Sequence, residues 1–206
     1  MQEKYSLKCI WIGLTGGPGC GKSEAVKSFS EIPGWQCYDT DQICHEIYEE
    51  SNSPLVRLME DRWGSEVRSA SGQPDRKVIA EKVFNNETER AWLNSILHPE
   101  ILFRLGNKIS ASGTEWALIE VPLLFEAKFD VRMDKTIAIW SPPEVQLERL
   151  LARGWTREHA EKRIASQLPA AKKLELADYG IINRGSLESL HEQCLHIADE
   201  IKSIFK

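Results

Sequence analysis

Short runs of apolar residues recur along the chain at intervals that suit a buried parallel sheet. Each run is bounded by Gly, Pro, Asp or Ser, residues that commonly mark the ends of strands. A strand covered by helices on both faces is nearly continuous in its apolar character, and these runs have that character. The pattern predicts five strands, at Cys9–Leu14, Gln36–Tyr38, Ala117–Val121, Thr136–Trp140 and Tyr179–Ile182.

Helical patterns separate these strands. The tetrad Ser141-Pro142-Pro143-Glu144 offers an N-cap, a first-turn proline and a capping-box Glu for a helix that runs to about Arg153. Strands that alternate with helices predict an α/β fold with a doubly wound parallel sheet. The C-terminal segment carries apolar residues at spacings of three and four, which predicts one buried helical stripe formed by Leu187, Leu190, Cys194, Ile197, Ile201 and Ile204.

The segment from about 43 to 112 breaks this alternation. About seventy residues of helix are too many for a simple crossover between two core strands. We therefore expect residues 1–42 and 113–206 to form the core that carries the sheet, and 43–112 to be a helical insertion, which on a nucleotide-binding core often holds a second substrate. Successive helices are predicted there after Asp41, from Ser53-Pro54, from Asp75, from Asn86 and after His98-Pro99.

Charge and cysteine usage exclude several classes of protein. The 26 basic and 31 acidic side chains give a net charge of −5, which argues against a general nucleic-acid binder. The chain has no apolar stretch of the length that a membrane span or a secretion signal requires. We therefore expect a cytoplasmic protein without nucleic-acid or membrane partners. The odd number of cysteines without metal-like spacing predicts reduced thiols.

The first predicted strand leads into a phosphate-binding motif. Residues 16–23 fit G-x-x-x-x-G-K-[ST] in full, and the helical segment Glu24–Phe29 follows. Glycines let backbone N–H groups surround phosphate oxygens, Lys22 reaches the β- and γ-phosphates, and the Ser23 hydroxyl ligates Mg²⁺. The motif predicts a nucleoside triphosphate with Mg²⁺ bound by Gly16, Gly17, Gly19, Cys20, Gly21, Lys22, Ser23 and Glu24.

A phosphate loop alone does not separate a kinase from a nucleotide switch. The Asn-Lys-x-Asp motif of guanine recognition is absent, and Asp61-Arg62-Trp63-Gly64 matches D-x-x-G inside a helical pattern. Asp39 and Asp41 favour a kinase, because they follow the second strand, at whose carboxyl end an α/β sheet binds ligands. In an extended segment successive side chains alternate in direction, so the carboxylates of Asp39 and Asp41 would point the same way. One can accept a hydroxyl proton, and the other can hold Mg²⁺ through water or cap the next helix.

Other charged residues have a functional and a purely structural interpretation. Arg149 and Arg153 share a helix face and can stabilise a phosphoryl transition state from a closing lid, or form a solvated basic surface. Glu120 ends a strand and can hold a magnesium-bound water, or be a surface carboxylate. Residues 149–173 hold seven basic and two acidic side chains, which predicts a local basic lid for small polyanions.

Eight segments of the chain form a further pattern. They are Gly13–Gly17, Asp39-x-Asp41, Leu97–Ile101, Val121–Glu126, Gln146–Arg149, Thr156–Glu158, Ala165–Gln167 and Ala177–Asn183. Together they resemble the dephospho-CoA kinase family over nearly the whole chain. The resemblance implies transfer of the ATP γ-phosphoryl group to the ribose 3′-hydroxyl of dephospho-CoA, which gives CoA and ADP in the last step of CoA biosynthesis. It also implies a helical CoA-binding domain and a mobile lid at about 143–170.

The resemblance implies roles for individual residues. Asp41 matches the general base, Arg149 the arginine that steadies the transferring phosphoryl group, and Asn183 an adenine contact, while His98 would lie near the CoA substrate. Arg76 and Lys77 can pair with the CoA pyrophosphate, or be solvated charges.

Pro18 and Cys20 depart from the usual loop residues, and Cys20 adds a thiol that can be reactive near a helix N-terminus. A kinase of another nucleoside or nucleotide, and a nucleotide switch, remain as alternatives. For the oligomeric state we expect a monomer or a weak homo-oligomer.

Overall fold

The computed structural model describes residues 9–51, 53–84 and 86–205. The chain divides into two compact units. One, which we call the sheet unit, comprises Met1–Asp39 and Ser112–Lys206, and the other, the helical unit, comprises Thr40–Ala111. Each unit is described by itself.

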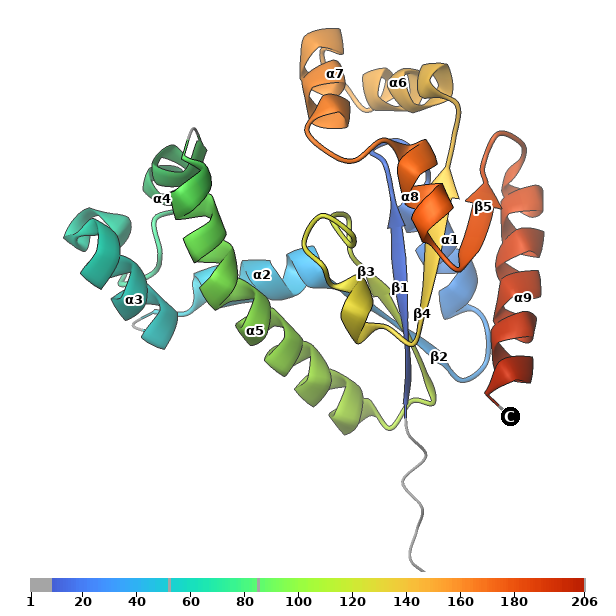
Figure 1. The fold of residues 1–206 in the computed structure, drawn as a ribbon, viewed down its shortest axis with the longest axis horizontal. Coiled ribbons are helices and arrows are strands. Elements are labelled where there is room, and N and C mark those ends of the chain that lie inside the picture. Colours follow the sequence, from blue (N-terminus) through green and yellow to red (C-terminus); the bar gives the residue numbers. More distant parts are fainter. Residues whose placement is uncertain (1–8, 52, 85, 206) are drawn as a thin grey trace, which may run out of the picture. The chain divides into compact units, whose positions relative to one another are not determined.

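The sheet unit is built on five parallel strands in the order β2-β3-β1-β4-β5 (Figure 1). This confirms the predicted α/β class and all five predicted strands. β1 extends two residues further than predicted, to the first glycine of the phosphate loop. The strands are β1 (Ile10–Gly16), β2 (Trp35–Asp39), β3 (Trp116–Glu120), β4 (Lys135–Trp140) and β5 (Tyr179–Ile182).

The two faces of the sheet are covered differently. On one face Ile12, Leu14 and Leu118 belong to the main hydrophobic cluster, together with residues of α1 (Lys22–Ser30) and α9 (Leu187–Ile204). On the other face small side chains leave room for the loop after β3. A Cβ on Gly13 would lie 2.9 Å from Met133 and 3.1 Å from Leu124 of that loop. The short helix α8 (Ala170–Leu176) packs on β4 and β1 and was not predicted.

The C-terminal helix confirms most of its predicted stripe. Leu190, Cys194, Ile197 and Ile201 are buried, whereas Leu187 and Ile204, at the two ends, are exposed. An 18-residue helix is about 27 Å long, and the four-residue strand β5 beside it is about 13 Å long. The helix is therefore longer than the strand beside it, and the ends of its apolar stripe lie beyond the core.

The segment after β4 forms α6 (Pro143–Ala152) and α7 (Arg157–Ala165). The predicted cap at Ser141 is wrong, because Pro142 occupies the N-cap position and no side chain caps the helix. Gly154, with φ of 85°, ends the first helix. The Thr156 side chain accepts a hydrogen bond from the His159 N–H and so begins α7.

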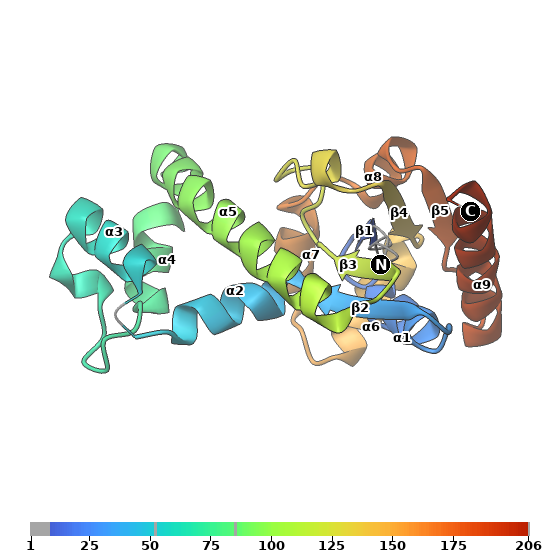
Figure 2. The same ribbon diagram turned by 90° about the horizontal axis from the view of Figure 1, so that it is seen from below.

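The helical unit contains α2 (Thr40–Glu49), α3 (Pro54–Trp63), a 3₁₀ turn (Ser65–Val67), α4 (Arg76–Phe84) and α5 (Glu87–Ser112), whose last residue belongs to the sheet unit (Figure 2). As predicted, Ser53 caps α3 and Pro54 is its first residue. Two helices predicted on either side of Pro99 are instead the single helix α5. Its buried side chains continue at intervals of four across the proline, and their packing outweighs the hydrogen bond that Pro99 cannot make. These side chains are Leu93, Leu97, Ile101, Leu105 and Ile109.

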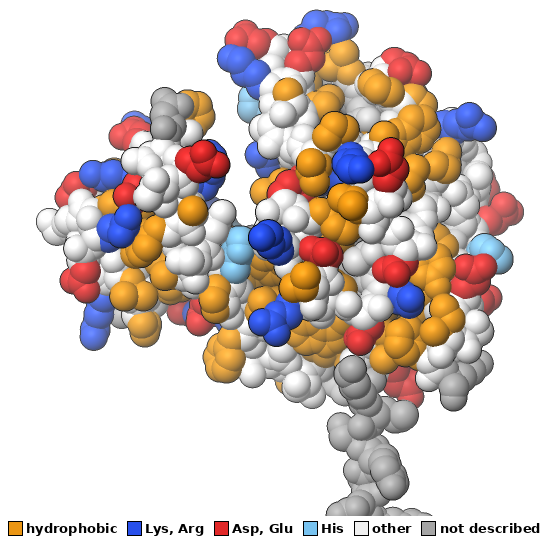
Figure 3. Space-filling model, in the orientation of Figure 1, with side chains coloured by type: hydrophobic (Ala, Val, Ile, Leu, Met, Phe, Trp, Pro, Cys, Tyr) orange, Lys and Arg blue, Asp and Glu red, His pale blue; other side chains and the backbone are white. Residues whose placement is uncertain are grey.

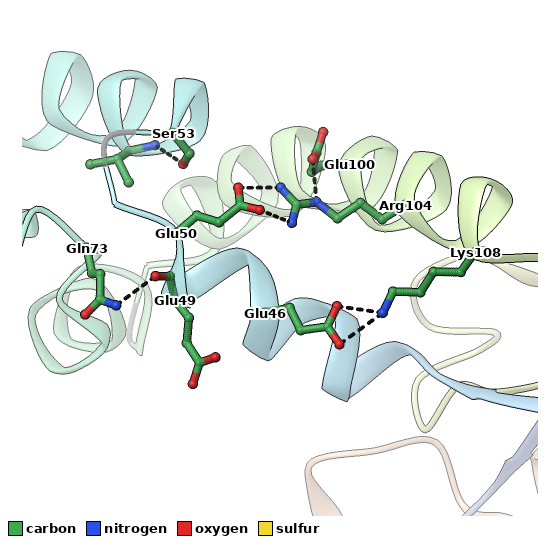
Figure 4. A network of polar contacts seen from close by, with 9 residues as sticks. Glu46, Glu49, Glu50, Ser53, Gln73, Glu100, Arg104 and Lys108 are labelled. Carbon is green, nitrogen blue, oxygen red and sulfur yellow. Dashed lines mark hydrogen bonds and ion pairs between the residues drawn. The ribbon is translucent and has the colours of Figure 1, made fainter. Parts of the chain in front are cut away.

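Ion pairs join α2 to α5. Both Nη atoms of Arg104 contact the Glu50 carboxylate at 2.6 Å, and its Nε contacts Glu100 at 2.6 Å. Lys108, one turn further along α5, contacts Glu46, one turn earlier along α2 (Figure 4). Planar two-point pairing of arginine with carboxylate fixes orientation as well as distance. The helix that bears Asp41 is therefore held in register with α5.

Aromatic pairs lie in three separate places. In the sheet unit Trp35 stacks on Trp116 with ring centroids 5.9 Å apart, and in the helical unit Trp63 meets the edge of Trp92 at 4.8 Å. Trp155, between α6 and α7, contacts His159 at 4.6 Å. In each place the indole ring packs against another ring.

The surface mixes charges of both signs. On the face drawn in Figure 3, acidic and basic side chains are interspersed with apolar ones. No helix within residues 9–51, 53–84 and 86–205 combines the length and apolar character that crossing a membrane requires.

Candidate functional site

The carboxyl ends of the parallel strands lie at one edge of the sheet, and an α/β fold binds its ligands at this edge. β1 ends in the phosphate loop, β2 at Asp39 and β3 at Glu120. The register sets Asp39 beside Glu120, and Glu120 beside Leu14. Two carboxylates therefore lie on neighbouring strands at the edge from which the loop begins.

The phosphate loop has the tight backbone that its glycines predict. Gly19 and Gly21 have φ of 75° and 100°, which residues with a side chain rarely adopt. A Cβ on Gly19 would lie 2.5 Å from the carbonyl oxygen of Gln146, and one on Gly21 would meet the Asn183 amide. The loop is thus closed in from behind, and α1 begins immediately after it at Lys22.

Lys22 and Ser23 begin the helix at the mouth of the loop. The Lys22 Nζ donates to the carbonyls of Gly16 and Gly17 at 3.0 and 3.3 Å, so its ammonium lies across the loop. The Ser23 side chain is exposed in the first turn of α1. A helix N-terminus adds partial positive charge at this point. The arrangement suits a triphosphate.

A buried polar cluster supports the loop from behind. The Asn183 amide donates to the Cys20 carbonyl at 2.8 Å, and the Ser141 hydroxyl donates to the Asn183 carbonyl at 2.6 Å. Arg149 donates to the Gly19 carbonyl at 3.2 Å, to Ser141 Oγ at 3.1 Å and to Asn183 Oδ1 at 3.4 Å. Ser141 and Asn183 are buried. These three residues fix two of the loop's carbonyl groups.

The thiol of Cys20 belongs to this buried layer. Cys20 is fully buried, and burial is the main reason that its pKa is raised, against the lowering effect of a backbone hydrogen bond from Ser141 and of Lys22. A raised pKa leaves the neutral thiol, which is a poor nucleophile. The structure therefore contradicts the expectation of a reactive thiol at this position.

The reasoning that paired Asp39 with Asp41 by alternation is wrong. β2 ends at Asp39 and α2 begins at Thr40, so the backbone between the two carboxylates is helical and not extended. Asp41 lies in the first turn of α2 in the helical unit, whereas Asp39 belongs to the sheet unit.

A pocket of about 420 Å³ opens in the helical unit. Its lining combines apolar side chains with groups suited to a polar substrate, which is the usual composition of a small-molecule site. Asp41 and Arg76, two residues predicted from the sequence, lie in it together. The lining is Asp41, Cys44, His45, Tyr48, Arg76, Ile79, Ala80, Val83 and Leu93.

The guanidinium of Arg76 is oriented by its neighbours. Its Nη2 contacts His45 Nδ1 and donates to the His45 carbonyl at 3.2 Å, and its Cζ lies 5.2 Å from the centre of the Tyr48 ring. Because arginine only donates, His45 Nδ1 accepts, and His45 Nε2 is then the donor to Glu49 at 2.8 Å. Arg76 is thereby held in the pocket wall as a cation.

His98 and the basic segment 149–173 lie outside the lining of this pocket. His98 is half-buried on α5, outside the lining of this pocket, and burial lowers its pKa. In the 149–173 segment, several cations pair with carboxylates one turn away: Arg157 with Glu161, Lys162 with Glu158, and Lys172 with Glu175. Arg153 is exposed at the end of α6. The expected basic lid is therefore partly neutralised within its own helices.

The loop fits Mg²⁺ bound together with a triphosphate. Oxygen donors suit this ion, and both the exposed Ser23 hydroxyl and the Glu120 carboxylate are oxygen donors near the loop. In the part of the chain that the structure describes, no group of three or more His, Cys, Asp or Glu side chains is arranged to hold a metal ion. An ion held mainly by phosphate oxygens and water needs no such group.

Sequence reasoning missed three residues of this region. Gln146 donates to the Ser141 carbonyl at 2.8 Å, and its backbone encloses Gly19. The sequence could have indicated Gln146, because it lies three residues before Arg149 and therefore on the same face of the helix. Ser141 was assigned to a cap. Lys173 is completely buried, and nothing in its sequence surroundings distinguishes it from an exposed lysine.

Comparisons with known proteins agree with one another. The profile of the family described as dephospho-CoA kinase matches residues 10–189. A dephospho-CoA kinase of Carboxydothermus hydrogenoformans is 39% identical over 93% of this chain and 94% of its own, and one of Leptospira interrogans is 37% identical over 91% and 90%.

Solved structures show the same fold. A Thermus thermophilus protein has a TM-score of 0.79 at 29% identity, covering 93% of this chain and 97% of its own. The dephospho-CoA kinase of Campylobacter jejuni has a TM-score of 0.65 at 26% identity, covering 93% and 96%. A shikimate kinase of Acinetobacter baumannii, at 15% identity and a TM-score of 0.54 over 98% of both chains, shares the fold alone.

Proposed function

The chain belongs to the dephospho-CoA kinase family, and we propose that it transfers the γ-phosphoryl group of ATP to the ribose 3′-hydroxyl of dephospho-CoA, giving CoA and ADP. It is an ATP-dependent phosphotransferase by family. The acceptor atom, the metal ion and the role of each residue are the parts that we propose.

The observation that carries the acceptor assignment is the pocket of the helical unit. Asp41 and Arg76, which are 35 positions apart in the sequence, line the same pocket of about 420 Å³. A carboxylate can accept the proton of a hydroxyl, and a guanidinium pairs with a pyrophosphate. Dephospho-CoA contains both groups, and the apolar remainder of the lining suits the less polar parts of such a substrate.

The phosphate loop holds the donor. Backbone N–H groups of residues 16–23, apart from Pro18, which has none, surround the phosphates of ATP. The Lys22 ammonium moves from the loop carbonyls to the β- and γ-phosphate oxygens. Asn183, which supports the loop from behind, also lies next to the adenine in this proposal. Glu24 and Arg153 complete the nucleotide site.

Mg²⁺ bound with ATP would neutralise charge on the β- and γ-phosphates. Ser23 would ligate it directly and Glu120 through a water molecule. Asp39, beside Glu120 at the same strand ends, contributes to the substrate site, and His98 contributes through α5.

In the reaction the 3′-oxygen bonds to the γ-phosphorus while the bond from that phosphorus to the β–γ bridging oxygen breaks, leaving ADP. Asp41 takes the hydroxyl proton. Arg149 neutralises charge on the transferring group, and a lid at about 143–170 excludes water. The chain works as a monomer or weak homo-oligomer, which sedimentation of the full-length protein at assay concentration tests.

One assay tests the reaction against its alternatives. ADP release is measured with dephospho-CoA, with a panel of nucleosides and nucleotides, and without acceptor, each with ATP and Mg²⁺. We expect release that depends on dephospho-CoA and a product phosphorylated at the 3′ position. Release that depends on a nucleoside would favour another kinase, and slow release that ignores every acceptor would favour a switch.

The role of Asp41 is tested by Asp41→Asn. Removing the general base lowers kcat by roughly 10²-fold or more, while ATP binding persists. Asp61→Asn, an exposed change on α3, is the matched control and leaves kcat unchanged. Near-normal turnover of Asp41→Asn would remove Asp41 from this role.

A further inference from the structure

Lys173 is the one side chain of the sheet unit that combines a full charge with complete burial among the described residues. It lies on α8 with 0% of its side chain exposed. Lysine is almost never buried to this extent unless it is paired, because its ammonium loses its hydration. Burial lowers its pKa, and the pairing with Glu126 opposes that shift. The proposed reaction assigns it no role.

Three acceptors satisfy the three N–H groups of the ammonium. Lys173 Nζ lies 3.0 Å from Glu126 Oε1, donates to the Pro122 carbonyl, and donates to Gln167 Oε1 at 3.4 Å. Glu126, whose side chain is 22% exposed, also accepts from the Leu168 N–H at 2.9 Å. Together these bonds join the loop that follows β3 to α8 and to the segment that leaves α7.

Both joined segments adjoin the phosphate loop. The Pro122 carbonyl that Lys173 contacts also accepts from Thr15 Oγ1 at 3.2 Å, and Thr15 directly precedes Gly16. Ala170, one turn before Lys173 on α8, would contact a Cβ placed on Gly17 at 3.4 Å. The loop after β3 begins next to Glu120. Lys173 thus lies where the phosphate loop, the end of β3 and the end of the expected lid converge.

Stability alone does not account for this arrangement. Well-packed apolar residues of similar volume often stabilise a protein as much as a buried ion pair does, whereas loss of one partner leaves an uncompensated charge. An ion pair adds what apolar packing lacks, namely directed bonds that fix two segments at defined points.

We propose that Lys173 is a positioning residue for phosphoryl transfer: with Glu126 it fixes the segment that leaves the lid against the loop after β3, and so holds the lid arginine and the phosphate loop in mutual alignment. The inference rests on the proposed function. Its prediction separates catalysis from stability, because alignment is lost whenever the bonds are lost, even in a protein that remains well folded.

The test is a double-mutant cycle of Lys173→Met, Glu126→Gln and the two combined, with kcat, both KM values and Tm measured on the full chain. Lys173→Met lowers kcat by roughly tenfold or more, as small misalignments do, and also lowers Tm. The double variant recovers Tm, because no unpaired charge remains, but its kcat stays low. Lys82→Met, which removes a lysine of α4 paired with Glu66, is the matched control and changes neither.

Two results would overturn the proposal. One is a double variant whose kcat recovers together with Tm, since the pair would then act through stability alone. The other is a well-folded Lys173→Met or double variant with the kcat of the wild type. If Lys173→Met does not fold, the double variant and Glu126→Gln alone decide. Wild-type turnover with dephospho-CoA tests the proposed function separately, and the ratio of variant to wild-type kcat is measured with whichever acceptor the wild type uses.

Discussion

Arg149 illustrates at the scale of one residue how a group that we propose for catalysis can also be structural. Its guanidinium is bound to the Gly19 carbonyl, to Ser141 and to Asn183. Arginine has five N–H donors in a rigid plane, so these contacts fix the orientation of the side chain while part of its donor capacity remains for a phosphoryl group. The residue that we propose to act on the transition state is thus already oriented by the loop that holds the donor.

Arg149→Ala should therefore affect turnover more than affinity. We expect kcat to fall by roughly 10²–10³-fold, the cost of removing a well-placed donor to a transition-state charge, with a smaller loss of ATP affinity from the loosened Gly19. Single-turnover kinetics and calorimetric titration with ATP measure the two effects. Arg153→Ala, at the exposed end of the same helix, is the comparison variant with a smaller effect. An effect of Arg149→Ala on ATP affinity alone would make it a ground-state binder.

The sequence indicated the chemistry of single residues better than their partners. The phosphate motif is local, so its residues could be assigned from spacing alone. Ser141 and Lys173 could not be assigned in this way, because their partners, Asn183 and Glu126, are 42 and 47 positions away. A serine before two prolines has the pattern of a cap, and only the tertiary structure shows that its hydroxyl points inward.

At the scale of elements, buried strands and amphipathic helices were predictable because their patterns depend on one buried face. All five strands and the middle of the α9 stripe follow from that rule, whereas the two ends of the stripe are exposed. α8 was missed, since its seven residues, Ala170–Leu176, span only about two turns and form no repeating stripe. The α5 helix was divided at Pro99 because local propensity favours a break there, whereas burial of apolar residues on both sides favours continuity.

Pro99 should therefore limit the stability of α5. The residue is exposed in the helix interior, so a side chain with an N–H can replace it without disturbing the core. Pro99→Ala should raise the free energy of unfolding by about 1–3 kcal/mol, because it restores the missing hydrogen bond. The greater conformational freedom of the unfolded chain without proline opposes part of this increase. Denaturant unfolding with constant m-value measures it. Gly106→Ala, in the same helix, gives a comparison of about 1 kcal/mol from helix propensity alone. A lowered stability of Pro99→Ala would show that the proline is required by the packing of α5.

At the scale of the whole molecule, the two substrates are assigned to different units. The phosphate loop belongs to the sheet unit, and the pocket with Asp41 and Arg76 belongs to the helical unit. This division follows the chain, since the helical unit is one continuous segment between β2 and β3. The sequence predicts a helical insertion at 43–112, because helical patterns replace the strand–helix alternation there. The pocket could not be predicted from the sequence, since its lining residues come from three helices.

Amide hydrogen exchange should distinguish the two sites. A non-hydrolysable ATP analogue with Mg²⁺, at about 100 times its Kd, should slow exchange in residues 16–25 by roughly a hundredfold where exchange occurs by local opening. Dephospho-CoA alone should instead protect α2 and α4. Protection by dephospho-CoA that is confined to the sheet unit would contradict the assignment of its pocket.

The placement of the tryptophans has an optical consequence. The Trp35–Trp116 stack, the Trp63–Trp92 pair and Trp155 beside His159 sit in three different surroundings. The indole ring emits light whose wavelength depends on the polarity around it, so each location contributes its own component to the intrinsic fluorescence. Phenylalanine in place of all indoles but Trp155 would leave a spectrum that follows α6 and α7 alone. The chain thus carries native fluorophores in its sheet unit, in its helical unit and beside α6 and α7, without any attached dye.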